Sequence, residues 1–293
     1  MRALTVKACA KVNLSLFITG QRPDGYHLLD MVMQSVSLCD ELLLEEDGAI
    51  TLQGDTAGAA GTDNLAIRAA CLLARESGLK AGCRITLKKR IPAQAGMGGG
   101  SADAAAVLLG LNQLWGVRAQ PEQLATLALS LGADVPFFLQ GGTARAQGIG
   151  ERLTPVVGFP RLELVIVKPG QGLATPAVFQ AWHRWGRERP SRTGAYLEAM
   201  ASGDYPMAAR LMENDLEAPA AALCPEIGQA LEAQRRCGAL RAMMTGSGTA
   251  VLGWYADGPS AARAAAELRC AGWRAWQVHS QKQAIEIHEG IHA

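Results

Sequence analysis

Apolar and polar side chains alternate over long stretches of the first fifty residues. Apolar residues occupy nearly every second position from Leu4 to Thr19, and the alternation resumes from Leu28 to Leu44 and from Ile50 to Gln53. Successive side chains of a strand point to opposite faces of a sheet, so this period indicates half-buried strands. We therefore expect three strands at the start of the chain.

A helical period follows the strands. From Asn64 to Ser77 the apolar residues recur near one helical face, directly after the cap-like pair Thr62-Asp63. The same patterns predict strands at 83–89 and 143–147 and helices at 101–115 and 121–131.

The second half of the chain mixes strands and helices without strict alternation. Strands are predicted at 162–168, 240–244, 250–255 and 274–279, and helices at 175–185, 193–201, 206–212, 225–237 and 259–271. This order favours α+β layers over a doubly wound parallel sheet. The polar, proline-broken stretch 150–160 is the expected boundary, which divides the chain into domains at 1–158 and 159–293.

Composition narrows the class of protein. At 293 residues, with 49% hydrophobic and 19% charged residues, the chain is typical of a soluble protein of two modest domains. A net charge of +1 gives no reason to expect a nucleic acid or a membrane as partner. The basic run Lys88-Lys89-Arg90 is interpreted as solvated charge at a strand end, or else as one side chain that helps to hold phosphates. Seven cysteines without a Cys-x-x-Cys pair favour reduced thiols and a cytoplasmic location.

Glycines crowd the segment from Ile91 to Ala105, which runs on into an Ala/Leu-rich helical pattern. Glycine accepts positive φ at little cost, so successive backbone N–H groups at a helix start can converge on one oxyanion. The P-loop and the dinucleotide fingerprint both require other spacings. We expect a polyphosphate ligand here; the alternative is a glycine-rich connection that Ser101 or Asp103 caps.

The flanks of these glycines carry a family resemblance. The order Pro-x-x-Ala-Gly-Met-Gly-Gly-Gly-Ser-x-Asp-Ala-Ala, from Pro92 to Ala105, resembles the phosphate loop of the galactokinase, homoserine kinase, mevalonate kinase and phosphomevalonate kinase (GHMP) superfamily. Three more segments, together with this loop, look like the four signatures of the 4-diphosphocytidyl-2-C-methyl-D-erythritol kinase family, in that family's order. They are Ala10-Lys11-Val12-Asn13-Leu14 with Asp24-Gly25-Tyr26-His27, Leu131-Gly132-Ala133-Asp134-Val135-Pro136, and Met244-Thr245-Gly246-Ser247-Gly248-Thr249.

The resemblance implies a fold and an activity. The fold would be α+β, with an amino-terminal domain like domain 2 of ribosomal protein S5, a ferredoxin-like carboxy-terminal domain, and a cleft between them. The activity would be transfer of the ATP γ-phosphoryl, with Mg²⁺, to the 2-hydroxyl of 4-diphosphocytidyl-2-C-methyl-D-erythritol, in the non-mevalonate route to isoprenoid precursors. The alternatives are a sibling kinase for homoserine, mevalonate or a sugar, and a ligand-binding regulator without activity.

The same resemblance implies roles for residues near the reacting groups. Asp134 would be the base that accepts the hydroxyl proton, although spacing alone favours a capping or turn role. Lys11 would be the catalytic lysine, close to Asp134 and to the transferring phosphoryl. Asn13, two residues further along the same strand face, would bind the acceptor or Lys11.

Binding residues follow in the same way. Tyr26 and His27 would hold the cytosine by stacking and hydrogen bonds, and Phe179 would be a second aromatic of that pocket. Gly246 and Ser247 would border the site, although a hairpin turn explains them equally well. The residues expected to bind ATP are Pro92, Ala93, Gln94, Ala95, Gly96, Met97, Gly98, Gly99, Gly100, Ser101, Ala102 and Asn64.

The chain departs from the family pattern at two positions. Cys9 stands where the family usually has proline, and Ala102 stands where it usually has a second serine, so one hydroxyl that could touch phosphate is absent. No carboxylate is assigned to Mg²⁺, and no other metal is expected. The run His288-Glu289-Gly290-Ile291-His292 matches the zinc-protease pattern, but its glycine and its lack of a third ligand predict a frayed tail instead. A monomer or weak homodimer is expected.

Overall fold

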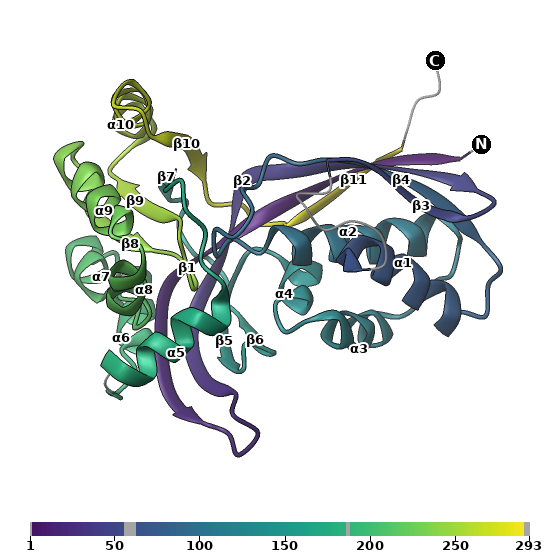
Figure 1. The fold of residues 1–293 in the computed structure, drawn as a ribbon, viewed down its shortest axis with the longest axis horizontal. Coiled ribbons are helices and arrows are strands. Elements are labelled where there is room, and N and C mark those ends of the chain that lie inside the picture. The colour runs from purple at the N-terminus through teal and green to yellow at the C-terminus, as the bar shows by residue number, and fades with distance from the viewer. Residues whose placement is uncertain (1, 56–62, 186–187, 290–293) are drawn as a thin grey trace.

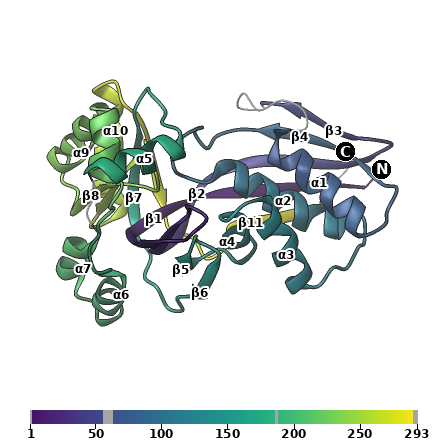
Figure 2. The ribbon, with the colours of Figure 1, turned by 60° about the horizontal axis from the view of Figure 1, so that its bottom comes forward.

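The computed structural model describes residues 2–55, 63–185 and 188–289. Within these ranges the chain forms two sheets, each with its own helices (Figure 1). The helices of the larger sheet lie toward one end of its two long first strands, and the smaller sheet and its helices lie toward the other end (Figure 2).

The larger sheet is built around two long antiparallel strands, β1 (Ala3–Gln21) and β2 (His27–Asp47). Its order is β11-β1-β2-β4-β3, and β5 pairs with the first part of β2 and also with β6. The alternation of the sequence is visible in β1, where Val6 and Ala8 are fully buried and Lys7 between them is exposed. The other strands of this sheet are β3 (Ile50–Gly54), β4 (Gly82–Lys88), β5 (Thr143–Gly148), β6 (Arg152–Pro155) and β11 (Ile285–Glu289).

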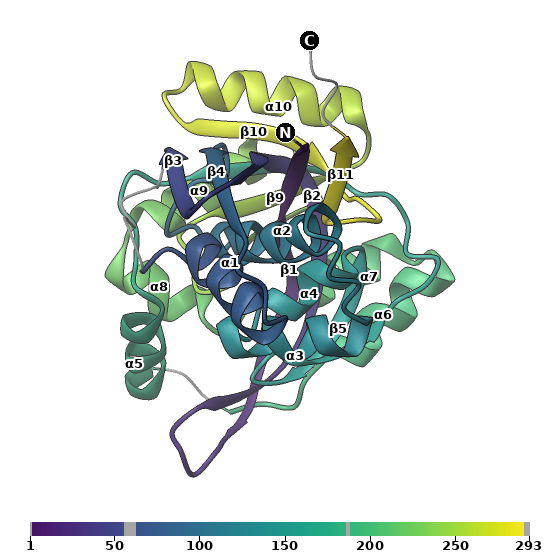
Figure 3. The ribbon, with the colours of Figure 1, turned by 90° about the vertical axis from the view of Figure 1, so that its right-hand side faces the viewer.

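Four helices cover one face of this sheet (Figure 3). They are α1 (Leu65–Glu76), α2 (Gly99–Leu114), α3 (Pro121–Leu131) and α4 (Val135–Gln140). The helix α2 packs closely on β1 and β2, and a Cβ at its Gly110 would lie 2.4 Å from Leu44 Cδ1. Close packing of this kind explains why the helix is rich in alanine and glycine.

The smaller sheet is antiparallel throughout, in the order β10-β7-β9-β8. Its strands are β7 (Glu163–Lys168), β8 (Arg241–Met244), β9 (Val251–Tyr255) and β10 (Arg274–His279). The helices of this half are α5 (Thr175–Trp185), α6 (Thr193–Ser202), α7 (Tyr205–Leu211), α8 (Glu217–Leu223), α9 (Glu226–Arg236) and α10 (Gly258–Cys270). Mixed layers of strands and helices confirm the α+β class, and this half is the expected ferredoxin-like domain.

Strand β11 departs from the expected division of the chain at residue 158. It pairs antiparallel with β1, from Leu4 opposite Glu289 to Ala8 opposite Ile285, and so belongs to the larger sheet. The expectation of a frayed tail is therefore wrong for His288 and Glu289, while residues 290–292 lie outside the described ranges. The physical reason is long-range pairing, because the open edge of β1 offers backbone partners that no local pattern reveals.

The expectation that all seven cysteines are reduced is also wrong. Cys9 and Cys39 form a disulfide between β1 and β2. They lie 30 positions apart in sequence, but the antiparallel register places them opposite each other with a Cα–Cα distance of 3.8 Å. Spacing alone could not reveal this pair. Cys71, Cys83, Cys224, Cys237 and Cys270 are free thiols.

The described helices are all too short or too polar to cross a lipid bilayer.

Candidate active site

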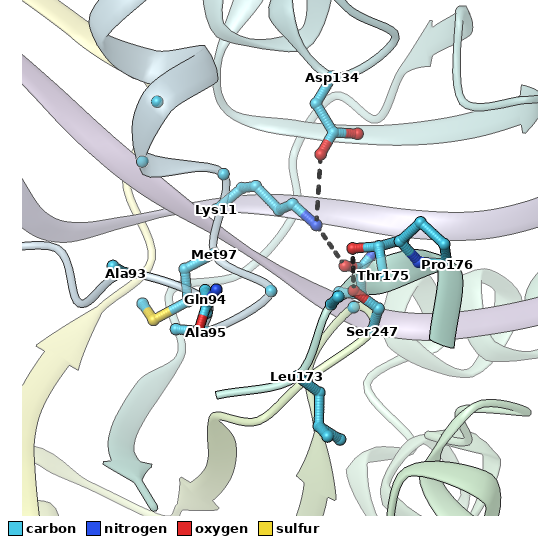
Figure 4. Close-up of a pocket in the computed structure, with 18 of the residues that line it drawn as sticks. Lys11, Ala93, Gln94, Ala95, Met97, Asp134, Leu173, Thr175, Pro176 and Ser247 are labelled. Atoms are coloured by element: carbon cyan, nitrogen blue, oxygen red, sulfur yellow. Dashed lines mark hydrogen bonds and ion pairs between the residues drawn. The ribbon is translucent and has the colours of Figure 1, made fainter. Parts of the chain in front are cut away.

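A cleft of about 1020 Å³ lies where the two halves meet. The segments that line it include the middle of β1, the β1–β2 hairpin, the glycine-rich loop, the residue before α4, α5 with the residues before it, and the turn between β8 and β9. Figure 4 shows side chains from several of these segments, among them Lys11, Asp134, Thr175 and Ser247, around one space. The cleft lies at the upper end of the usual size range of small-ligand pockets.

Lys11 and Asp134 face each other across the cleft. Lys11 is 5% exposed, and its Nζ lies 3.8 Å from Asp134 Oδ2 and donates to Asn13 Oδ1 at 2.7 Å (Figure 4). Asn13 is held in turn, because its backbone N–H donates to Thr245 Oγ1 at 2.8 Å. Asp134 occupies the N-cap position of α4 but makes no capping bond, so its carboxylate stays directed at the ammonium.

The glycine-rich loop is shaped by its backbone. Gly96 and Gly98 have φ of +71° and +70°, and a Cβ on Gly96 would lie 2.3 Å from the carbonyl oxygen of Thr245. The loop carbonyl of Met97 accepts from Lys11 N at 3.0 Å, and that of Ala95 accepts from Ala250 N at 3.2 Å. The loop is therefore bonded to both halves of the protein, and only glycine fits at its closest approach.

The start of α2 differs from the expected one. The helix begins at Gly99 with Gly98 as its N-cap, two residues earlier than predicted, so neither Ser101 nor Asp103 caps it. Residues 92–100 and Asn64 line the cleft as expected. Ser101 and Ala102 are not among the lining residues, and Ala102 is fully buried on the core side of α2. Asn64 caps α1 by accepting from Ala66 N at 2.9 Å.

The basic run before the loop is solvated only in part. The side chains of Lys88 and Arg90 are 68% and 50% exposed, as expected for strand-end charges. Lys89 corrects that interpretation, because its side chain is 9% exposed and binds the carboxylates of Asp40 and Asp103. Alternation explains the difference, since Lys89 turns inward between two neighbours that turn out.

The far end of the cleft holds a cluster of imidazoles and aromatic rings. His27 stacks on Phe179 with ring centroids 4.6 Å apart, and His183 lies 4.8 Å from the same imidazole. Burial lowers the pKa of His27, and the nearby His183 lowers it further. His27 Nε2 is buried without a hydrogen-bond partner. Tyr26 lines the cleft but is 60% exposed, so in this structure His27 rather than Tyr26 stacks on Phe179.

Sequence reasoning missed His183. It lies on α5, four residues after Phe179, and a helix brings residues at that spacing to one face. That spacing is the signal that could have found it.

Gly246 and Ser247 form the turn between β8 and β9, and both line the cleft. Ser247 Oγ lies 2.8 Å from Thr175 Oγ1 (Figure 4). Asn214, which the sequence did not single out, donates from Nδ2 to the carbonyl oxygens of Met244 and Gly246, each at 2.8 Å. The turn is therefore tied both to α5 and to the segment that precedes α8.

The described residues contain no group of three or more His, Cys, Asp or Glu side chains arranged to hold a metal ion. A dedicated protein cage for Mg²⁺ is thus absent from the described part of the chain, and no ligand is assigned.

Comparisons with known proteins agree with this geometry. Residues 64–142 match the GHMP kinases N terminal domain, and residues 196–275 match the GHMP kinases C terminal family. The chain is 44% identical over 269 residues to a 4-diphosphocytidyl-2-C-methyl-D-erythritol kinase of Pelotomaculum thermopropionicum, covering 91% of this chain and 94% of that one. A relative of the same name from Geobacter sulfurreducens is 38% identical, covering 96% of this chain and 100% of that one.

Solved structures give the same result. A crystal structure of 4-(cytidine 5'-diphospho)-2C-methyl-D-erythritol kinase superposes with a TM-score of 0.81 at 41% identity, over 94% of this chain and 99% of that one. A homoserine kinase from Cytophaga hutchinsonii, with a TM-score of 0.76 at 19% identity, shares the fold over 98% of this chain and 97% of its own. The chain therefore belongs to the GHMP kinases and, within them, to the 4-diphosphocytidyl-2-C-methyl-D-erythritol kinase family.

Proposed function

We infer that this protein transfers the γ-phosphoryl group of ATP to the 2-hydroxyl of 4-diphosphocytidyl-2-C-methyl-D-erythritol, giving the 2-phosphate and ADP. The reaction belongs to the non-mevalonate route to isoprenoid precursors. One observation carries the inference: a lysine–aspartate pair lies in the same cleft as a glycine loop at one end and an imidazole–aromatic cluster at the other. A phosphoryl donor and a cytidine-bearing acceptor would then meet at Lys11 and Asp134.

The chain's own groups account for the proton and for the developing charge. The acceptor oxygen forms a bond to the γ-phosphorus as the bond to the β-phosphate oxygen breaks, and Asp134 accepts the hydroxyl proton. The Lys11 ammonium, 3.8 Å from Asp134, stabilises negative charge on the transferring oxygens. The backbone N–H groups at the start of α2 would bind the ATP phosphates.

We propose that Mg²⁺ enters with ATP and neutralises its phosphates. It usually retains several waters and binds few protein ligands, which agrees with the lack of a carboxylate cage among the described residues. No step of the reaction is assigned to it here.

We also propose a cytoplasmic enzyme that acts as a monomer or weak homodimer. Its need for ATP supports the location, while the cysteines do not decide it, because five are free thiols and Cys9 and Cys39 form a disulfide.

At the acceptor end, we propose that Tyr26, His27 and Phe179 hold the cytosine. The stacked rings of His27 and Phe179 provide an aromatic surface, and the unpartnered His27 Nε2 provides a polar atom for the base edge. A sibling kinase for homoserine, mevalonate or a sugar would have no use for this cluster.

ADP release with ATP and Mg²⁺ tests the proposal, with the diphosphocytidyl substrate, homoserine, mevalonate and galactose offered in parallel. We expect turnover of the cytidine compound alone, and a fall in kcat of about 10²- to 10⁴-fold in Asp134→Asn. Because Asp134 makes no capping bond, the thermal unfolding of this variant should match that of the wild type. Turnover of another acceptor would place the protein with a sibling kinase, and no turnover at all would favour the ligand-binding alternative.

A further inference from the structure

Three charged side chains form a buried triad behind the glycine-rich loop. Lys89 Nζ donates to Asp103 Oδ2 at 2.7 Å and to Asp40 Oδ2 at a still closer approach. Asp40 is fully buried, Asp103 is 3% exposed, and the Lys89 side chain is 9% exposed. The roles assigned above to Lys11 and Asp134 leave these three groups without a function.

The triad joins the elements that shape the loop. Asp40 comes from β2, and its Oδ1 also accepts from the backbone N–H groups of Arg90, at 2.6 Å, and Ile91, at 2.8 Å. Asp103 comes from the first turns of α2. A Cβ on Gly99 would lie 3.3 Å from Lys89 Nζ, so the ammonium sits directly against the start of that helix. Both ends of the loop, its entry and its exit into α2, are thus tied to one ammonium.

The triad has one positive and two potentially negative groups. Burial would lower the pKa of Lys89, but Asp103 and Asp40 outweigh burial and raise it, so the ammonium stays charged. Burial raises the pKa of Asp103 to about 7; Lys89 opposes this rise and Asp40 adds to it. Asp103 Oδ1 is buried without a hydrogen-bond partner, which costs a neutral carboxyl group less than a carboxylate.

Few charged groups act on the protonation of Asp103. Lys89, after β4, and Asp40, on β2, are the charged groups that act on it. The other elements packed on α2, which are α1, α3, α4, β1 and β11, contribute none of the groups that shift it. Lys89 and Asp103 both line the cleft beside the loop glycines, so a bound polyphosphate would sense the net charge of the triad.

We propose that the triad of Asp40, Lys89 and Asp103 positions the glycine-rich loop, and that binding of a nucleoside triphosphate is coupled to the uptake of one proton by Asp103. With Asp103 ionised the triad carries a net charge of −1 and repels the incoming phosphates; with Asp103 neutral it carries none. The triad is a positioning device and takes no part in phosphoryl transfer. The proposal rests on the ATP-dependent function inferred above.

The raised pKa of Asp103 sets the direction in which the KM for ATP should change with pH. Below about pH 7 the carboxyl is neutral and the KM for ATP should be low. Above that pH the KM for ATP should rise, by at most about tenfold per pH unit, while kcat is spared. In Asp103→Asn, which mimics the neutral carboxyl, the KM for ATP should stay low across this range.

The dependence of folding stability on pH provides a second, separate measurement. Because the folded protein holds the Asp103 proton up to about pH 7 and the unfolded chain releases it near 3.8, wild-type stability should fall as pH rises through this window. Asp103→Asn should lose this slope.

Isothermal titration of ATP without Mg²⁺, in two buffers of different ionisation enthalpy at pH 8, measures the proton uptake directly. We expect close to one more proton taken up by the wild type than by Asp103→Asn, since protonation of ATP itself is common to both. Glu41→Gln is the matched control. It removes the carboxylate of the residue after Asp40, and the ion pairs of Glu41 with Lys88 and Arg90 lie at the surface. This variant should therefore behave like the wild type. Equal proton uptake by wild type and Asp103→Asn would overturn the proposal.

A second variant keeps the test decisive if Asp103→Asn does not fold. In Asp40→Asn the amide oxygen can still accept from the loop backbone, while the loss of charge lowers the pKa of Asp103, so proton uptake at pH 8 should disappear. Persistence of the uptake would overturn the proposal. A wild-type protein that does not bind ATP would instead contradict the proposed function, so the two failures are distinguishable.

Discussion

The glycine-rich end of the cleft is organised by backbone and buried charge, whereas the opposite end is organised by half-buried and exposed side chains. At the first end, left-handed glycines, a loop bonded to both halves and the Asp40–Lys89–Asp103 triad hold one conformation. At the second end, His27 at the start of β2 meets Phe179 and His183 on α5, beside the 60% exposed Tyr26. Under the proposed function, phosphate recognition would depend on main-chain geometry, and recognition of the acceptor would depend on side-chain identity.

The largest expected effect tests the glycine-rich end of the cleft. In Gly96→Ala the new Cβ would lie 2.3 Å from the Thr245 carbonyl oxygen, in a backbone with φ of +71°. The clash adds to a backbone strain of about 1–3 kcal/mol, so the KM for ATP should rise by roughly 5- to 150-fold or more, while the KM for the acceptor stays nearly unchanged. Steady-state kinetics with each substrate varied in turn checks this.

Gly78→Ala is the matched control for that variant. Gly78 has a similar φ of +66°, but nothing lies within 4 Å of a Cβ placed there. Its substitution should cost some stability and change neither KM. Equal changes in both KM values for Gly96→Ala would mean that the two ends of the cleft are not independent.

A smaller effect tests the opposite end of the cleft, which holds His27 and Phe179. Phe179→Ala removes the ring that stacks on His27. If it also stacks on the base, the loss of about 1–3 kcal/mol should raise the KM for the cytidine compound roughly 5- to 150-fold, with the KM for ATP unchanged. Tyr205→Ala, which removes a 43% exposed ring from α7, should change neither value. An unaltered acceptor KM in Phe179→Ala would remove this ring from the proposed pocket.

The smallest expected effect is a pH dependence confined to the acceptor. Burial and His183 lower the pKa of His27 below its usual 6.5, so the ring is neutral at pH 7 and gains its charge only as the solution is acidified. As the pH is lowered below 6.5 the acceptor KM should rise by a few-fold, since the charged ring can no longer accept a hydrogen bond from the base.

His183→Gln sharpens that measurement. Without the neighbouring imidazole the pKa of His27 should move up, and the rise in acceptor KM should begin at a higher pH. A rise that begins at the same pH in wild type and variant would show that His183 does not act on His27.

The same contrast explains what could be predicted from the sequence. The glycine loop, the strand bearing Lys11 and Asn13, and most helices depend on local spacing, and they lie where their patterns indicate. Asp134 was found through the motif around it, and its pairing with Lys11 is present in the structure. In each case a short segment carries its own conformational preference.

Long-range pairing accounts for most of what the sequence did not reveal. The disulfide of Cys9 and Cys39, the burial of Lys89 against Asp40, and the return of β11 to the first sheet all depend on segments far apart in the chain. The short elements α4, α8 and β6, of four to seven residues, also escaped prediction because so few positions establish no period.

The pairing of β11 with β1 also bears on how the chain folds as it is made. Synthesis runs from the amino end, so β1 can pair with β2 early but must wait for residues 285–289 before its other edge is covered. Until then a long strand presents unpaired backbone N–H and C=O groups, the feature by which nascent chains associate edge to edge. Strand β11 thus closes the first sheet long after β1 and β2 have been made, and until then the chain is open to edge-to-edge association.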